Sequence, residues 1–127
     1  MDISQYFKSV LEEDRCAVVI CNVDHKIIYM NPAACERYKK RGGKKLIGGN
    51  LLDCHNSASN EMIIKVLDWF KADASNNRVH TYYSEKESKD VYMVALRDDN
   101  GTLIGYYEKH EYRIRDNTPF YELKNEY

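Results

Sequence analysis

The stretch Asp24-His25-Lys26-Ile27-Ile28-Tyr29-Met30-Asn31-Pro32-Ala33-Ala34 contains the local signals that decide the fold. Asp24-His25 predicts a turn, and the apolar residues after it predict a strand. Asn31-Pro32 then predicts a helix start, because asparagine caps helices well and proline suits their first turn. The continuous apolar run Cys16–Cys21 precedes the turn and indicates a buried strand. These two strands should pair as a hairpin.

Amphipathic helices are expected on both sides of this hairpin. Residues 2–13 place apolar side chains at helical spacing on one stripe, which could serve as a dimer element or as a lid on the sheet. The stripe consists of Ile3, Tyr6, Phe7, Val10 and Leu11. The longest helix is predicted over about residues 59–72, with Ser57 or Ser59 as its cap. Its expected inner face is Met62, Ile63, Val66, Leu67 and Phe70.

Three further strands are expected near residues 79–85, 89–98 and 102–114. Asp98-Asp99-Asn100-Gly101 is a strong hairpin signal between the last two. This order predicts an α+β fold, with a five-stranded antiparallel sheet and helices packed on one face. We expect an N-terminal helix over residues 1–13, one domain over 14–115 and a C-terminal tail over 116–127.

Composition narrows the classes of function. The chain has 127 residues, a net charge of −1 and 43% apolar residues, which suits a globular domain without a general attraction for nucleic acid. We expect a solvated loop from the basic cluster Lys39, Lys40, Arg41, Lys44 and Lys45. No signal peptide and no apolar run of about 20 residues is seen, so we expect a cytoplasmic protein away from membranes. The four cysteines lack metal-ligand spacing and should be reduced thiols.

The opening stretch resembles the start of the PAS domain family. Leu46–Asp53 resembles the middle motif of that family, and Arg97–Tyr106 resembles its final hairpin. Together the three motifs span about residues 14–114. Two departures stand out: His25 occupies a turn position where glycine is common, and Arg113-Ile114-Arg115-Asp116 replaces the usual Asp-Ile-Thr exit.

The resemblance implies a sensory or regulatory domain of signal transduction without enzymatic activity. Cys54-His55-Asn56 resembles a bacterial subset with a Cys-His pair before the long helix. Such domains sense small ligands and commonly dimerise through N-terminal helices. We therefore expect a bacterial PAS-like sensor that acts as a homodimer or through a separate effector protein. Ligand binding would repack the long helix against the sheet and alter that interface.

The expected ligand cavity lies between the sheet and the long helix. Its candidate residues are Tyr29, His55, Ile63, Leu67, Met93, Tyr106 and Glu108. Alternation along the last strand places Tyr106, Glu108 and His110 on one face. Glu108 or His110 could hydrogen-bond His55 or a ligand, or both could simply be solvated at an edge or dimer surface.

Several alternatives remain at this stage. His55 could ligate haem, since neutral imidazole is a common axial ligand, or it could have a structural role at a helix start. Flavin photochemistry is disfavoured because Leu51, not cysteine, follows Asn50. A Cys-His hydrolase is disfavoured because adjacent side chains such as Cys54 and His55 usually diverge. The chief rival is a protein–protein interaction module that binds no ligand.

Overall fold

The computed structural model describes residues 1–123, so the last four residues of the expected tail 116–127 lie outside the described residues. The elements in chain order are α1 (Ser4–Glu13), β1 (Val19–Asn22), β2 (Ile27–Met30), α2 (Pro32–Arg37), the 3-10 helices η1 (Lys39–Arg41), η2 (Gly43–Leu46) and η3 (Leu51–Cys54), α3 (Ser57–Ala72), β3 (Arg78–Ser84), β4 (Lys89–Arg97) and β5 (Leu103–Tyr112). No helix among residues 1–123 is long and apolar enough to cross a membrane.

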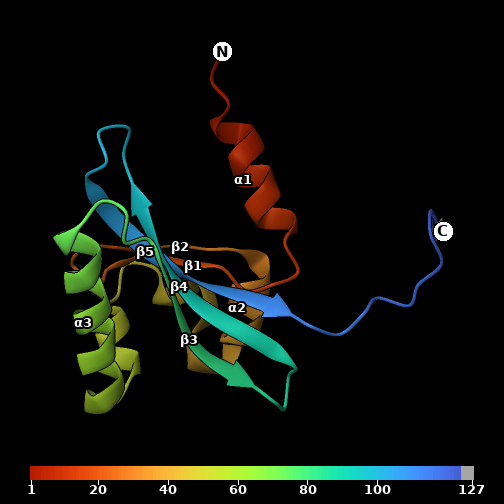
Figure 1. The fold of residues 1–127 in the computed structure, drawn as a ribbon. Coiled ribbons are helices and arrows are strands. Elements are labelled where there is room, and N and C mark those ends of the chain that lie inside the picture. The colour runs from red at the N-terminus through yellow and green to blue at the C-terminus, as the bar shows by residue number, and fades with distance from the viewer. Residues whose placement is uncertain (124–127) are drawn as a thin grey trace.

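The strands form one five-stranded antiparallel sheet in the order β2-β1-β5-β4-β3 (Figure 1). The last strand therefore lies in the middle of the sheet, between the first strand and β4. This arrangement confirms the predicted α+β class with a five-stranded antiparallel sheet. The three C-terminal strands thus join the first two in a single layer.

Asn31 sets where β1 begins. Its backbone N–H donates to the Val18 carbonyl (3.1 Å), and its side-chain oxygen accepts from the Val18 N–H (2.9 Å). Its side-chain NH₂ group donates to the Cys16 carbonyl at 2.9 Å. Residues 16–18 are thus bonded to one side chain and its backbone, so the strand starts at Val19 and not at Cys16 as predicted.

Asn31 also begins α2, as predicted. Its side-chain oxygen accepts from the Ala34 N–H at 2.9 Å, and Pro32 occupies the first helical position. The turn before β2 is confirmed too, with His25 in the left-handed region at φ 67°. The Asn22 side chain closes this turn by accepting from the N–H groups of Asp24 and Lys26.

Helix α3 covers one face of the sheet with Val66, Leu67 and Phe70, all of them buried. Ile63 is half-buried, but Met62 is 59% exposed, so its predicted inward position is wrong. The cap is Asn56, whose side chain accepts from the Ser59 N–H at 2.8 Å. The helix therefore starts at Ser57, two residues before the predicted start, and neither Ser57 nor Ser59 caps it.

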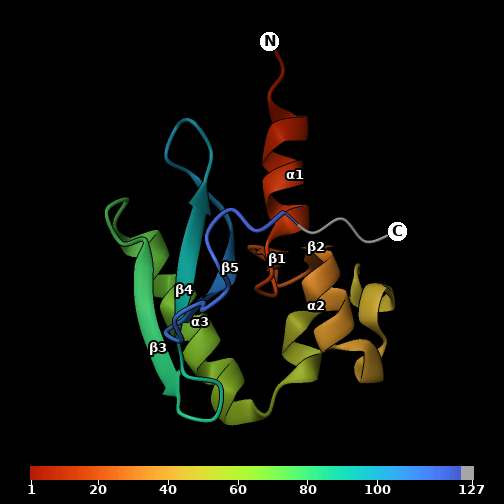
Figure 2. The ribbon, with the colours of Figure 1, turned by 90° about the vertical axis from the view of Figure 1, so that its right-hand side faces the viewer.

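Helix α1 projects away from the sheet in both ribbon views (Figures 1 and 2). None of its residues is buried, and its predicted apolar stripe is largely exposed. Tyr6, Phe7 and Val10 are 64%, 61% and 70% exposed. The stripe exists as the spacing predicts, but it covers no part of this sheet.

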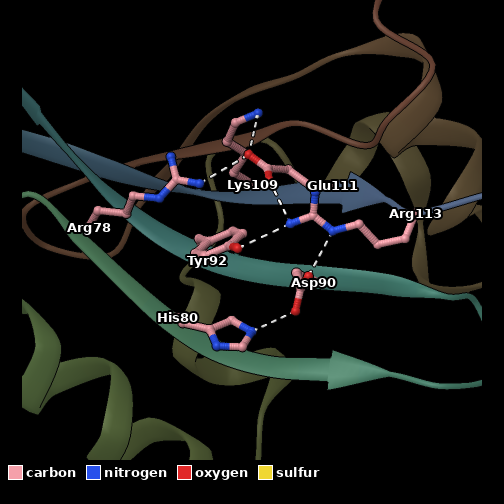
Figure 3. A network of polar contacts seen from close by, with 7 residues as sticks. All are labelled: Arg78, His80, Asp90, Tyr92, Lys109, Glu111 and Arg113. Atoms are coloured by element: carbon pink, nitrogen blue, oxygen red, sulfur yellow. Dashed lines mark hydrogen bonds and ion pairs between the residues drawn. The ribbon is translucent and has the colours of Figure 1, made fainter.

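The outer face of β3, β4 and β5 carries a network of polar side chains (Figure 3). Arg113 donates to Asp90 at 2.8 Å, and Arg78 donates to Glu111 at 3.0 Å. His80 contacts the other oxygen of Asp90 at 2.8 Å. This face is therefore polar, and the side chains that alternate with it along β4 and β5 point toward the helices.

Candidate functional site

A cavity of about 120 Å³ lies between the inner face of the sheet and the helical segment that follows β2. The strands contribute one wall and the segment from α2 to α3 contributes the other. The lining residues are Ala17, Val19, Cys21, Ile27, Met30, Tyr38, Arg41, Leu46, Leu51, Cys54, His55, Ile63, Met93, Tyr106, Glu108 and His110. Most of these side chains are apolar, so the polar ones stand out as candidates for ligand recognition.

Strand β5 supplies three polar side chains to one wall, at every second position. Tyr106 is buried, and its hydroxyl group lies 2.9 Å from Nδ1 of His25. Burial, and secondarily the neighbouring Cys21, raises the pKa of the Tyr106 hydroxyl, so this group is neutral at physiological pH. His110 is buried as well, and Nε2 of its ring lies 3.2 Å from a carboxylate oxygen of the half-exposed Glu108.

The rim of the cavity is more exposed and carries His55 and Arg41. Nδ1 of His55 contacts the Leu51 carbonyl at 3.0 Å, which fixes the proton of a neutral ring on Nδ1. Arg41 donates to the Cys54 carbonyl at 3.3 Å. The predicted loop around Arg41 instead forms η1 and η2, and it brings one of its basic side chains to the cavity.

Five of the seven predicted site residues line this cavity: His55, Ile63, Met93, Tyr106 and Glu108. Tyr29 lies elsewhere, because its hydroxyl group donates to Glu12 of α1 at 2.7 Å. Leu67 belongs to the core beside Phe70 and does not reach the cavity. The pairing of His55 with Glu108 or His110, one of the two readings left open, is not found: His55 contacts Leu51, and Glu108 contacts His110.

Tyr38, Arg41 and Cys21 are cavity residues that the sequence reasoning did not select. Arg41 lies in a cluster of basic residues that resembles any solvated loop, so no signal distinguished it. Cys21 faces inward by simple alternation along the chain, since Ala17 and Val19 line the same wall and Cys21 pairs with Tyr106 of β5. Burial raises the pKa of Cys21 to about 11, so this thiol is protonated and a poor nucleophile at neutral pH.

The cavity does not fit a haem group as it stands. Sites for drug-sized ligands typically occupy about 300–1,000 Å³, well above the 120 Å³ found here. No group of three or more His, Cys, Asp or Glu side chains within residues 1–123 is arranged to hold a metal ion. The arrangement suits a smaller molecule that is held by hydrogen bonds and apolar contacts.

Comparison with known proteins agrees with the fold. A family model described as a PAS domain matches residues 15–108. A C-terminal domain from Streptococcus mutans is 24% identical with a TM-score of 0.64, covering 87% of this chain and 84% of that chain. A PAS domain from Colwellia psychrerythraea is 14% identical with a TM-score of 0.64, over 87% and 96% of the two chains.

A third structure, that of the Aer2 receptor from Vibrio cholerae, described as a dual PAS-heme oxygen sensor, is 17% identical with a TM-score of 0.53. The match covers 74% of this chain and 90% of that chain. No curated protein matches the sequence. At these identities the structural matches establish the fold, and the family model establishes which sequence family carries it.

Proposed function

Because the chain belongs to the PAS domain family, whose members are generally sensory domains of signal transduction, we propose that it detects a small ligand in the cavity beneath its sheet. The observation that carries this proposal is the cavity itself. Its walls combine an apolar lining with a few polar groups on β5 and at the rim, which is the usual composition of a small-molecule site.

The response to a ligand would pass through α3. Ile63 of this helix lines the cavity, whereas Val66 and Phe70 anchor the next two turns in the core. A ligand against Ile63 would therefore favour one packing of α3 on the sheet over another. Such a shift changes the population of an interface-competent state without requiring chemistry.

We propose that the output interface is a homodimer formed through α1, with a separate effector protein as the next partner. Helix α1 projects away from the sheet (Figure 2), and most of the apolar side chains of its stripe are exposed. Burying it against a second copy would remove this apolar surface from water.

We propose no enzymatic activity for the chain. His55 contacts a backbone carbonyl through Nδ1, and the cavity thiol of Cys21 is protonated at neutral pH. We place the protein in the bacterial cytoplasm, a setting with which its four free cysteines agree.

Native mass spectrometry of the purified chain, with a visible absorption spectrum, tests for a retained ligand. The matched variants are Ile63→Trp, which fills the cavity, and Ile64→Trp, which adds the same ring at a position 44% exposed on the same helix. We expect the bound mass to be lost in Ile63→Trp and kept in Ile64→Trp.

The rival function is an interaction module that binds no ligand. It would be favoured by wild-type protein that carries no extra mass and shows no amide chemical-shift changes around the cavity with any member of a small-molecule library. Equal retention of a ligand by both tryptophan variants would instead place the binding site outside this cavity.

A further inference from the structure

His110, at the end of the polar wall of this cavity, has a ring nitrogen without a hydrogen-bond partner among the described residues. The His110 side chain is only 4% exposed, and its Nδ1 is buried without a partner among residues 1–123. A buried polar atom left in this state costs about 1–3 kcal/mol, so native proteins usually provide it with a partner.

We propose that this nitrogen selects the ligand: the cavity takes a compact molecule with an apolar body and one O–H or N–H group, which donates to Nδ1 of His110. The proposal rests on the proposed function, because it requires that the cavity be a ligand site. It adds the chemical class of the ligand and the residue that recognises it.

Glu108 decides which nitrogen of the His110 ring carries the proton. The Glu108 carboxylate lies 3.2 Å from Nε2 of this ring. A lone pair on Nε2 would face a negative charge, whereas an N–H there is attracted to it. The neutral ring is therefore protonated on Nε2, and Nδ1 is left as a hydrogen-bond acceptor.

Three other polar groups of the cavity already have partners. The Tyr106 hydroxyl contacts His25, Nδ1 of His55 contacts the Leu51 carbonyl, and Arg41 donates to the Cys54 carbonyl. His110 lines the same cavity, and its Nδ1 lacks a partner among residues 1–123. The ligand must supply the donor, because this atom offers only a lone pair.

The size of the cavity limits the rest of the ligand. The volume of about 120 Å³ is close to that of an engineered apolar cavity of about 150 Å³, which admits benzene. The ligand body is therefore of the order of one six-membered ring. The apolar side chains Met30, Ile63 and Met93 would surround such a body.

Phenol and toluene test this selection, because they have the same number of heavy atoms and only phenol can donate a hydrogen bond. Protein amide shifts would be titrated with each probe at about pH 8, where an ordinary histidine ring is neutral. The variants are His110→Leu and, as the matched control on the outer face, His80→Leu. Circular dichroism would verify that both variants are folded.

We expect wild type and His80→Leu to bind phenol about 3- to 10-fold more tightly than toluene, the factor that one net hydrogen bond provides. The preference should disappear in His110→Leu, and phenol should shift the His110 Nδ1 resonance of the wild type. Equal affinities in the wild type, or a preference that survives in His110→Leu, would overturn the inference and leave the proposed function standing. Binding of neither probe, together with no retained ligand, would overturn both.

Discussion

Asn31 is a residue that joins three segments of the chain. Its side-chain oxygen accepts from the N–H groups of Val18 and Ala34, and its NH₂ group contacts the carbonyls of Leu11, Asp14 and Cys16. The end of α1, the entry to β1 and the start of α2 are therefore joined by a single buried side chain. Its capping role follows from the Asn-Pro pair, but its contacts with residues 11–18 do not, because only the folded chain brings those carbonyls close.

Replacing Asn31 with alanine should lower the free energy of unfolding by about 2–4 kcal/mol, because several buried backbone groups lose their partner at once. Asn31→Asp should be comparably destabilising, since a carboxylate cannot donate to the three carbonyls. Urea unfolding measures both. The control is Asn56→Ala, which removes the exposed cap of α3 and should cost about 1 kcal/mol. A loss at position 31 no larger than at position 56 would contradict this account.

Gly105 permits the close approach of β5 to β1. A Cβ atom at this position would clash with the Cys21 carbonyl oxygen and would lie close to other backbone atoms of β1. Backbone atoms of a central strand pair cannot move aside as a flexible side chain can. We expect Gly105→Ala to destabilise the protein by about 2 kcal/mol or more, measured by thermal or urea unfolding.

The neighbouring variant Ile104→Ala provides the control for Gly105→Ala, because Ile104 is 50% exposed. Its effect should stay within about 1 kcal/mol. If Gly105→Ala were as mild as this control, the two strands would have room that the structure does not show.

At the scale of elements, a side chain from the sheet binds the C-terminal end of α3. The Arg97 guanidinium donates to the carbonyls of Phe70, Asp73 and Asn76, and also to Asn77. A positive charge with several donors at a helix C-terminus offsets both its unpaired carbonyls and its dipole. This link holds the end of α3 to β4, on which Arg97 lies.

Arg97→Ala should lower the free energy of unfolding by about 2–3 kcal/mol, and Arg97→Lys should recover only part of it, because an ammonium group cannot reach all these acceptors. Hydrogen exchange should show the largest loss of protection in the last turn of α3. Lys71→Ala removes an exposed positive charge from the same turn and should change little. An equal response to Lys71→Ala and Arg97→Ala would assign the effect to general charge and not to this contact.

The apolar stripe of α1 leads to a prediction about assembly. Phe7→Glu places a charge within the stripe and should convert the proposed dimer to a monomer in light scattering coupled to size exclusion. Ser9→Glu adds the same charge outside the stripe and should leave the dimer intact. A wild-type protein that is monomeric at every accessible concentration would rule out the α1 interface.

The order and type of the elements could be predicted from the sequence because each segment has a clear period and clear turn residues. The ends of the elements were less predictable. β1 loses its first three predicted residues to Asn31, and α3 starts two residues early because Asn56, in the Cys-His-Asn segment, caps it. Both differences arise from side chains that compete for backbone groups, which periodicity does not detect.

At the scale of the whole molecule, an ion pair joins segments far apart in the chain. Both nitrogens at the tip of Arg37 donate to Glu87, at 2.8 and 3.0 Å, and the ammonium of the buried Lys89 lies 3.2 Å from the same carboxylate. Arg37 ends α2, whereas Glu87 lies in the turn between β3 and β4. The pair thus links α2, in the helical layer, to the turn between β3 and β4.

Because of this pair, the free energy of unfolding should depend on pH in the acid range. Hydrogen bonds from Arg37 lower the pKa of Glu87 to about 2 from its ordinary 4.5. Its contribution is therefore fully present above about pH 4.5 and is lost as the pH falls from there toward 2. After allowance for solvent screening, we expect a contribution on the order of 1–2 kcal/mol.

Urea unfolding of wild type and Glu87→Gln at several pH values tests this dependence. The difference between the two should be largest near neutral pH and should shrink toward zero as the pH falls to about 2. Glu85→Gln, in the same turn, should match wild type throughout. A difference that stayed constant with pH would show that the Glu87 charge is not the source.

At this scale, only some of the cavity residues could be predicted from the sequence. Residues on strands with clean alternation, such as Met93, Tyr106 and Glu108, were predicted correctly to share the inner face. Tyr29 was not predicted correctly, because a bulge in β2 interrupts its alternation and turns Ile27 and Met30 inward instead. Arg41 reaches the cavity only through the fold of η1 and η2, and no local pattern encodes that path.

The position of β5 between β1 and β4 has a consequence during synthesis on the ribosome. Both edges of the gap that β5 fills, one on β1 and one on β4, are made before β5 itself emerges. Until then the nascent chain exposes two unsatisfied strand edges and an unfinished core, the kind of surface that chaperones engage. The final strand thus acts as the closing piece of the domain, and a stall in translation before residue 103 would leave an aggregation-prone intermediate.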